Sequence, residues 1–297
     1  MTNVFEKIAQ RFLDALSENI VPWQKPWSFT FGENLDLTKL AISYTTKKPY
    51  SMVNQWLMPS GEYISFNNCK KLGGSVKKGA KSFEVYGFFP KWRIIATNEW
   101  VDVEPLHLDE SEYEKVPCLR AFKVFNIEDC EGIKPHTFPK AETPKVEPIT
   151  KAEDVISGYC NKYPTLKFHR VRQDSAYYAP LRDEIFVPTL AQYQVKEEFY
   201  STAFHEIAHS TGHQTRLNRS GITKHDGFGS ENYSKEELIA EMASAMTLNY
   251  IGIDCAKAFN NSIAYVQSWA KKIKKDPKIV AIAASQAEKA SKLILGI

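Results

Sequence analysis

The stretch FHEIAHSTGH, residues 204–213, decides the fold class of the second half of this 297-residue chain. His205 and His209 are four positions apart, so on a helix they project from one face and can share a metal ion. Glu206 lies beside them, where its carboxylate could act on a water molecule. Because Ile207 and neighbouring apolar residues would bury this helix, paired histidines without a ligand would be costly. We therefore expect a divalent metal site with one Zn²⁺ per chain, since imidazole and carboxylate ligands suit zinc.

A catalytic zinc site has three protein ligands and one open position, so a third ligand must lie outside the pair of histidines. His213 is near, but the pattern HExxHxxGxxH would need a histidine at position 215, where the chain has Thr215. Since His213 also follows Gly212, which is expected to end the helix, we expect it to cap backbone carbonyls or to line the rim of a substrate cleft.

The segment YSKEELIAEMASAM, residues 233–246, offers acidic ligands on a second helix. Glu237 and Glu241 are four positions apart on one helical face. Their spacing resembles that of gluzincins, in which one carboxylate binds zinc and an acid four residues later orients a ligand histidine. The resemblance implies that Glu237 is the ligand and Glu241 the orienting acid. Ser234 and Glu237 also fit a capping box at a helix start, and in that case Glu241 becomes the ligand.

Residues 176–188, AYYAPLRDEIFVP, precede the metal-binding helix and are expected to form a strand. The resemblance to zincins implies that this is an edge strand that lies along the substrate cleft. An extended substrate would lie against this strand around Ile185. Tyr177 and Tyr178 could then help to bind the substrate or to steady an oxyanion. The alternative that both tyrosines are ordinary strand aromatics stays open.

The rest of the sequence predicts an α+β protein in two domains. Residues 1–133 begin with an amphipathic helical pattern and continue with short β-branched and aromatic runs, which are typical of a mixed α/β domain. Residues 134–150 contain four prolines and predict a semi-extended linker that holds the domains apart. Residues 151–297 are expected to form a mostly helical metal-binding domain with a small sheet.

Composition excludes some locations and partners. No apolar run reaches the length of a membrane span, so we expect no membrane partner. The five cysteines contain no CxxC pair, which indicates free thiols, no cysteine zinc site and a cytoplasmic location.

Charge is distributed unevenly along the first domain. Residues 37–95 contain ten basic and two acidic side chains, a net charge of +8. Residues 96–133 contain three basic and ten acidic side chains, a net charge of −7. The first stretch is therefore a candidate surface for a polyanion, and the second is not expected to touch one.

The basic stretch and the segment before it combine lysines with aromatic residues, as single-stranded nucleic acid binders do. Nothing resembles a helix-turn-helix or a zinc finger, so little sequence preference is expected. Most of the aromatic residues nearby, which include Tyr44, Trp56, Tyr63 and Phe66, could instead form a core. The candidate DNA-binding residues are Trp23, Lys25, Trp27, Lys47, Lys48, Tyr50, Lys70, Lys71, Lys77, Lys78 and Lys81.

Both halves of the sequence resemble the ArdC family of antirestriction proteins. The first half is similar in VPWQKPW (21–27), TKKPYSMVN (46–54), YISFNNCKKLGGSVKKGAKS (63–82) and FKVFNIEDCEGI (122–133), and the second half in residues 199–219 and EELIAE (236–241). The resemblance implies a plasmid or other mobile-element protein, active in conjugation, that protects incoming DNA from host restriction endonucleases. It also implies a single-stranded-DNA-binding first domain and a zincin-like metallopeptidase second domain.

Two functions follow from these observations and remain open at the level of sequence. In one, the second domain is a zinc peptidase, with Glu206 as its base and DNA-bound proteins such as restriction endonucleases as candidate substrates. In the other, the chain only coats DNA, and the zinc site is structural or dispensable. A DNA hydrolase fits less well, because one metal held by two imidazoles is not the paired-metal carboxylate site typical of nucleases.

Overall fold

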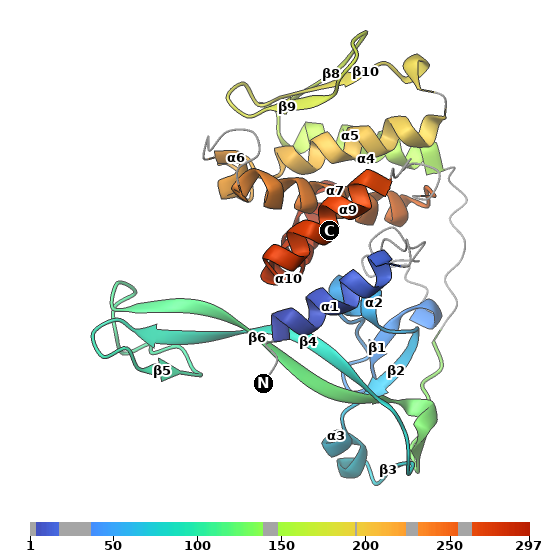
Figure 1. The fold of residues 1–297 in the computed structure, drawn as a ribbon, viewed down its shortest axis with the longest axis vertical. Coiled ribbons are helices and arrows are strands. Elements are labelled where there is room, and N and C mark those ends of the chain that lie inside the picture. Colours follow the sequence, from blue (N-terminus) through green and yellow to red (C-terminus); the bar gives the residue numbers. More distant parts are fainter. Residues whose placement is uncertain (1–3, 18–36, 139–147, 194, 224–230, 255–262) are drawn as a thin grey trace.

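The computed structural model describes residues 4–17, 37–138, 148–193, 195–223, 231–254 and 263–297. The two halves of the chain lie one above the other along the long axis of the molecule (Figure 1). The fold is mixed α and β, as expected. The described helices are α1 (Val4–Ser17), α2 (Met52–Leu57), α3 (Phe66–Lys71), α4 (Pro148–Lys162), α5 (Lys196–Ser210), α6 (Ser220–Thr223), α7 (Glu231–Ile251), α9 (Ile263–Lys275) and α10 (Lys278–Leu295).

Three sheets accompany these helices. A five-stranded sheet in the N-terminal half has the order β1-β2-β6-β4-β5, a three-stranded sheet in the C-terminal half has the order β8-β10-β9, and β3 pairs with β7. The described strands are β1 (Ala41–Ser43), β2 (Gly61–Ile64), β3 (Ser75–Val76), β4 (Ser82–Ile94), β5 (Trp100–Val101), β6 (Tyr113–Asn126), β7 (Cys130–Glu131), β8 (Lys167–Val171), β9 (Tyr177–Ala179) and β10 (Glu184–Pro188).

Strands β4 and β6 form the longest hairpin, which pairs in register from Ser82 opposite Phe125 to Ile94 opposite Tyr113. Its first part packs in the N-terminal half, where Val85 and Val124 are buried. Its far part projects from the body of the molecule and ends beside β5 (Figure 1). We call residues 95–114, which comprise the segment that joins β4 to β6 and the first two residues of β6, the arm tip.

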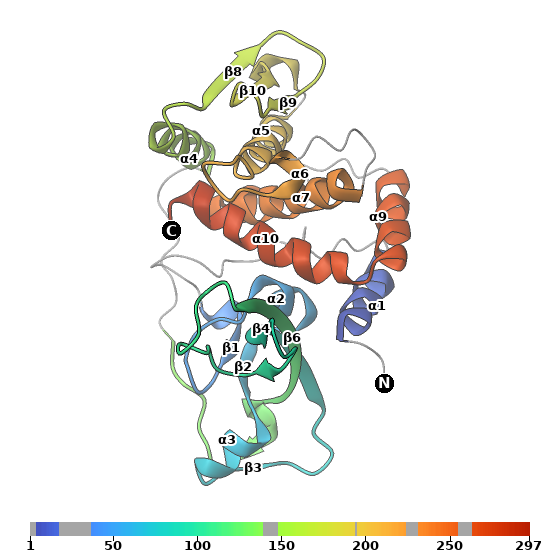
Figure 2. The same ribbon diagram turned by 90° about the vertical axis from the view of Figure 1, so that its left-hand side faces the viewer.

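The two halves are packed together by one apolar core. Ile8 and Phe12 of α1, and Trp56 of α2, are buried in the same cluster as the C-terminal helices. Helix α10 contacts α1 and α2 on one side and α7 on the other (Figure 2). The expectation that a proline-rich linker holds the two parts apart is therefore wrong. Of the predicted linker, residues 148–150 already belong to α4, and residues 139–147 lie outside the described part.

The C-terminal sheet corrects the expected strand over residues 176–188. These residues form two antiparallel strands, β9 and β10, and β10 lies between β8 and β9. Ile185 is fully buried in this central strand, so a substrate cannot pair with it. Strand β9 lies at an edge of this sheet, where its outer side has no partner among the described strands. It also packs near α5.

No helix among the described ranges has both the length and the apolar content needed to cross a membrane.

Candidate metal centre

Helices α5 and α7 pack against each other and carry the predicted site. Phe204 and Ile207 of α5 face the core and are fully buried, which turns the opposite histidines toward α7. Ala240 and Ala243 of α7 are also fully buried, and their small side chains allow a close approach of the two helices.

The structure brings His205, His209 and Glu237 together. One ligand atom from each lies within 4.8 Å of the others. The two Nε2 atoms are 3.1 Å apart, and the Glu237 carboxylate lies 3.5 Å from His205 Nε2 and 3.4 Å from His209 Nε2. These are three donors of the kind a divalent cation takes in a zincin-like site.

The outer nitrogen of each imidazole faces another carboxylate. Glu241 Oε2 lies 3.5 Å from His205 Nδ1, and Glu236 Oε1 lies 3.3 Å from His209 Nδ1. A carboxylate on the outer nitrogen fixes the ring orientation and leaves Nε2 free to bind a metal. Glu241 thus faces the outer nitrogen of His205, whereas Glu237 faces the Nε2 atoms of both imidazoles. Helix α7 spans Glu231–Ile251, so Ser234 lies inside it and the capping-box alternative for Glu237 does not apply.

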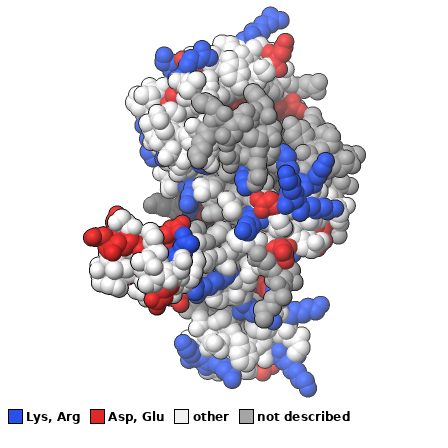
Figure 3. Space-filling model, turned by 60° about the vertical axis from the view of Figure 1, so that its left-hand side comes forward, with Lys and Arg blue, Asp and Glu red and all other residues white. Residues whose placement is uncertain are grey.

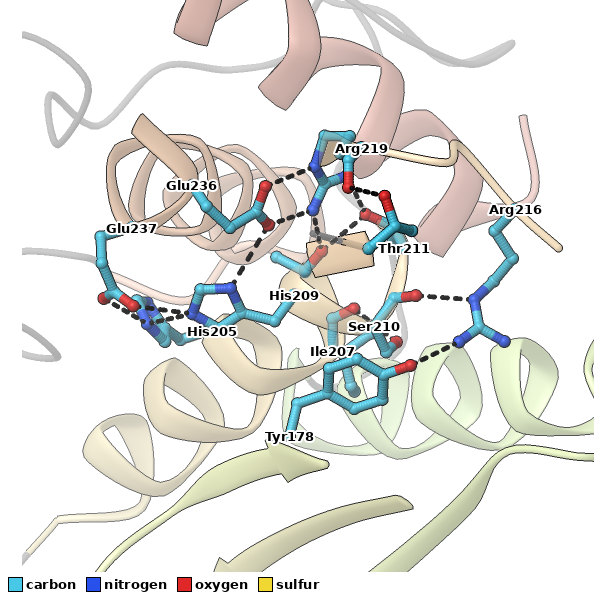
Figure 4. A network of polar contacts seen from close by, with 12 residues as sticks. Tyr178, His205, Ile207, His209, Ser210, Thr211, Arg216, Arg219, Glu236 and Glu237 are labelled. Carbon is cyan, nitrogen blue, oxygen red and sulfur yellow. Dashed lines mark hydrogen bonds and ion pairs between the residues drawn. The ribbon is translucent and has the colours of Figure 1, made fainter. Parts of the chain in front are cut away.

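Glu236 is a site residue that the sequence did not reveal. Its side chain is 2 % exposed and is held by Arg219 on both oxygens, at 2.9 Å from Nε and 2.5 Å from Nη2. Arg219 also donates to the Ala208 carbonyl and to the Thr211 hydroxyl, at the end of α5 (Figure 4). The guanidinium thus links the end of α5 to Glu236 of α7, the residue whose carboxylate contacts His209.

Gly212 makes room for this arginine. A Cβ built on Gly212 would lie 2.6 Å from Ile222 Cγ1 and 3.0 Å from Arg219 Nη2. The sequence suggested that this glycine only ends the helix, but α5 ends at Ser210 and Gly212 lies in the following turn. Its lack of a side chain is needed for the approach of Arg219.

Electrostatics at the site favour a cation. Burial lowers the pKa of His209, but hydrogen bonds to Glu236 and Glu237 outweigh it and raise the pKa to about 9. The pKa of His205 is also raised well above its ordinary value, because Glu237 and Glu241 outweigh the effect of burial. The Glu237 pKa is lowered despite burial, since both imidazoles hydrogen-bond to it. The donor set and the surrounding negative charge therefore fit a divalent cation.

Glu206 lies on α5 between the two histidines and is 8 % exposed. No hydrogen bond or ion pair ties its carboxylate to another residue of the described part. Burial raises the pKa of Tyr193, a hydrogen bond with Thr202 lowers it, and the Glu206 charge raises it further. Tyr193 and Thr202 line a depression of about 430 Å³ together with residues 173–176, Pro188 and Gln192.

The two tyrosines predicted to line the cleft have different surroundings. The Tyr178 hydroxyl donates to Asp183 at 2.8 Å and accepts from Arg216, so it belongs to a buried network (Figure 4). Tyr177 is 41 % exposed and stacks on Phe186, away from that network. Neither set of contacts supports an oxyanion role. The contacts of both tyrosines fit the alternative that they are ordinary aromatic residues of a strand.

His213 lies in the turn after α5 and is not part of the His205–His209–Glu237 cluster. Its Nδ1 contacts Thr215 Oγ1 at 2.9 Å, and its carbonyl accepts from the backbone of Arg216 and Asn218. It therefore supports the turn that leads to Arg219.

The candidate DNA-binding lysines gather at the far end of the N-terminal half. Trp23, Lys25 and Trp27 lie outside the described residues. Exposed lysines occur on α3, in the segment between β3 and β4, and before α2, and basic side chains gather at this end in Figure 3. We call this set the basic surface: Lys47, Lys48, Lys70, Lys71, Lys77, Lys78 and Lys81.

The aromatic residues near the basic surface divide into core and surface. Trp56 and Tyr63 are buried, and Tyr50 is half-buried, with a pKa raised by burial. Phe66 is 46 % exposed, and Lys70 Nζ lies 5.1 Å from the centre of its ring. Phe66 is thus the aromatic that offers a stacking face beside the lysines, which its sequence position alone could not show.

Comparisons with known proteins match both halves. The model of the N-terminal domain of anti-restriction factor ArdC matches residues 2–125, and a zincin-like metallopeptidase model matches residues 165–286. Two Escherichia coli proteins named DNA primase TraC are 29% and 30% identical over 98% of this chain, which spans only 27% and 20% of their lengths. An uncharacterised protein, y4eC of Sinorhizobium fredii, is 24% identical over 97% of this chain and 90% of its own length.

Solved structures confirm the fold. The crystal structures of antirestriction ArdC from plasmid R388, metal-free and Mn(II)-bound, superpose with TM-scores of 0.66 and 0.67 at 24% identity. The match covers 99% of this chain and 97% and 98% of theirs.

Fold and site together define a two-domain protein in which a mixed α/β domain precedes a zincin-like metallopeptidase domain. The order of the two matched domains is the one implied by the sequence resemblance. The N-terminal half matches the N-terminal domain of the ArdC family, and the C-terminal half matches zincin-like metallopeptidases.

Proposed function

We propose that the chain is an antirestriction protein that binds single-stranded DNA through the basic surface and carries a zinc-dependent peptidase centre between α5 and α7. The observation that carries the second part is the cluster of two histidines and Glu237, with three further carboxylates beside it. In this proposal His205, His209 and Glu237 hold Zn²⁺, and Glu241 and Glu236 orient the two imidazoles. The Mn(II)-bound ArdC structure supports a divalent cation in the family.

A bound Zn²⁺ would supply a Lewis acid that polarises a carbonyl and favours deprotonation of water. The chain's own residues do the rest. Glu206, whose carboxylate has no described protein partner, accepts a proton from a water molecule in the site and passes it to the leaving amine. Arg219 and Glu236 keep the His209 ring in place while this happens.

A protein substrate is proposed to lie extended along the outer edge of β9. The depression beside Thr202 and Tyr193 would then receive one of its side chains. Thr202 precedes Glu206 by four residues and therefore faces the same side of α5. DNA-bound proteins such as restriction endonucleases are the candidate substrates, in the cytoplasm of the host or recipient cell.

The DNA-binding part rests on exposed lysines and one exposed ring. None of the lysines in the basic surface forms an ion pair with a described acidic residue, although Lys77 Nζ donates to the Glu128 carbonyl at 2.8 Å. Their charges are therefore available to phosphate. Phe66, under Lys70, can stack on an unpaired base. Little sequence preference is expected, because phosphate contacts and stacking carry no base-specific code.

The alternative is a DNA-coating protein whose metal site is structural or dispensable. Structural zinc sites are closed, whereas here the His205 and Glu237 side chains are 22% and 27% exposed. That access favours a site at which a substrate can reach the cation.

The test compares wild type, Glu206→Gln and the control Glu197→Gln, a half-buried acid in the first turn of α5. Transfer of unmodified plasmid DNA into a restricting host measures protection, and mass spectrometry of the restriction enzyme measures new termini. We expect Glu206→Gln to keep its metal and its DNA binding but to lose cleavage and protection, while Glu197→Gln behaves as wild type. Full protection by Glu206→Gln without any cleavage would support the coating function instead.

A further inference from the structure

The arm tip exposes an unusual number of apolar side chains. Ile95 is 54%, Trp100 48%, Val103 76% and Leu106 83% exposed. All four lie within residues 95–106, at the end of a hairpin that projects from the body (Figure 1). Soluble proteins seldom place so much apolar surface on one exposed element unless it contacts a partner, and tryptophan is enriched in such contacts.

The charge of the arm tip restricts what that partner can be. Residues 95–114 contain seven acidic and no basic side chains, and all seven acids are exposed. Asp102 pairs with Lys91 and Arg120, and Glu114 pairs with Arg93. No basic side chain in the described ranges pairs with Glu99, Glu104, Asp109, Glu110 or Glu112. The arm tip therefore repels DNA and fits a protein surface that is both basic and partly apolar.

The chain itself contains such a surface. The basic surface carries seven exposed lysines without ion pairs in the described part, beside the acids Glu128, Asp129 and Glu131. Phe66 and Leu72 are 46% and 53% exposed among those lysines. Both surfaces thus combine unpaired charge, of opposite sign, with exposed apolar side chains.

The two surfaces cannot meet within one molecule. Helix α3 and strand β3 lie at one end of the N-terminal half, and the arm tip lies at the far end of the β4–β6 hairpin (Figure 1). The hairpin is held by continuous pairing from Ser82–Phe125 to Ile94–Tyr113, so it does not fold back. Contact between them requires a second molecule.

We propose that the arm tip of one copy docks on the basic surface of a second copy. The apolar side chains supply the contact area, and the opposite charges select the partner and its orientation. Resting on the proposed DNA function, this contact uses the same lysines as single-stranded DNA. Self-association and DNA binding therefore compete. The DNA-free protein is associated, and binding of single-stranded DNA dissociates it into monomers.

Sedimentation of the full chain tests the proposal. At about 0.05 M salt the average mass of the wild type should rise with concentration above that of the monomer, and at about 0.5 M salt it should return to it. The tip variant Glu99→Lys/Glu110→Lys and the base variant Lys70→Glu/Lys71→Glu should each stay monomeric. Leu106→Ser, at an exposed position, should weaken association several-fold without changing the fold. Wild type that stays monomeric at low salt overturns the proposal.

Mixing the two charge variants gives the sharper result. One intact arm tip and one intact basic surface are then present on different molecules, so the mixture should associate although neither variant does alone. A mixture that stays monomeric overturns the proposal. A short oligothymidylate should return the wild type to monomer mass, and association that survives saturating oligothymidylate overturns the shared surface.

The outcome is separable from that of the proposed function. The tip variant should bind oligothymidylate at least as tightly as wild type, because its basic surface is intact. If the base variant loses self-association but keeps its affinity for oligothymidylate, the DNA-binding surface is wrong while the docking surface stands.

Discussion

The metal centre and the basic surface differ in how their functional side chains are held. At the centre, each imidazole has two carboxylates, and the Glu236 carboxylate has a buried arginine. On the basic surface, the lysines are exposed and have no ionic partner among the described residues. The side chains of the metal centre are therefore held in place before a ligand binds, whereas those of the basic surface become ordered only when a ligand binds. Substitutions should therefore have large, site-specific effects at the centre and small, additive effects on the surface.

The largest effect is expected on metal content. His209→Ala should reduce stoichiometric zinc to none in purified protein, because two donors rarely hold the ion. Inductively coupled plasma mass spectrometry measures this, with His213→Ala as a control that keeps its metal, since His213 lies outside the cluster. Full zinc occupancy in His209→Ala would show that the cluster is not the site.

The two glutamates of α7 can be ranked in the same assay. Glu237→Gln should lose the metal nearly as completely as His209→Ala, whereas Glu241→Gln should lower affinity only about 10–100-fold, as expected for an acid that orients a ligand. The reverse ranking would make Glu241 the ligand.

The next largest effect concerns the stability of the protein without metal. Arg219→Met leaves the buried Glu236 carboxylate without its main partner and should lower the free energy of unfolding by about 3–5 kcal/mol. Urea denaturation in the presence of a chelator measures this loss. The double variant Arg219→Met/Glu236→Leu removes both charges and should lose less. Equal losses would mean that the arginine acts through Thr211 and Ala208 rather than through the ion pair.

The sequence predicted the candidate metal ligands better than the residues that hold them in place. The reason is that the spacing of residues along a helix determines which side chains share one face. His205, His209, Glu237 and Glu241 could be placed by counting four residues along a helix. Glu236 and Arg219 could not, since their pairing depends on how α5, α7 and the turn between them pack. The same limit applied to residues 176–188, where the turn at 180–183 divides one expected strand into β9 and β10. Helix α1 shows the same limit. Its apolar periodicity predicted a helix, but the sequence did not show that this helix packs against the C-terminal helices.

An intermediate effect should come from Gly212. Alanine at this position places a Cβ within 2.6 Å of Ile222 Cγ1, so Ile222 and Arg219 must shift. We expect a loss of about 1–3 kcal/mol in chemical denaturation, as for overpacked cores. Gly158→Ala is the matched control, because nothing lies within 4 Å of its added Cβ and it lies inside α4. That control should gain roughly 0.5–1 kcal/mol.

The smallest effect is expected on the basic surface, and it separates the two regions most directly. A lysine that contacts phosphate contributes mainly by releasing condensed counterions, so Lys71→Gln should reduce the slope of log affinity against log salt by about 0.7 for single-stranded DNA. Fluorescence anisotropy of a labelled oligothymidylate across a salt series measures this slope. Lys167→Gln changes the same charge on β8, at the opposite end of the molecule from α3 (Figure 1), and should leave the slope unchanged. If both variants lower the slope equally, the DNA follows the charge of the whole chain and no local surface holds it. If Lys71→Gln abolishes binding outright, the surface is preorganised like the metal centre, and the contrast between the two regions fails.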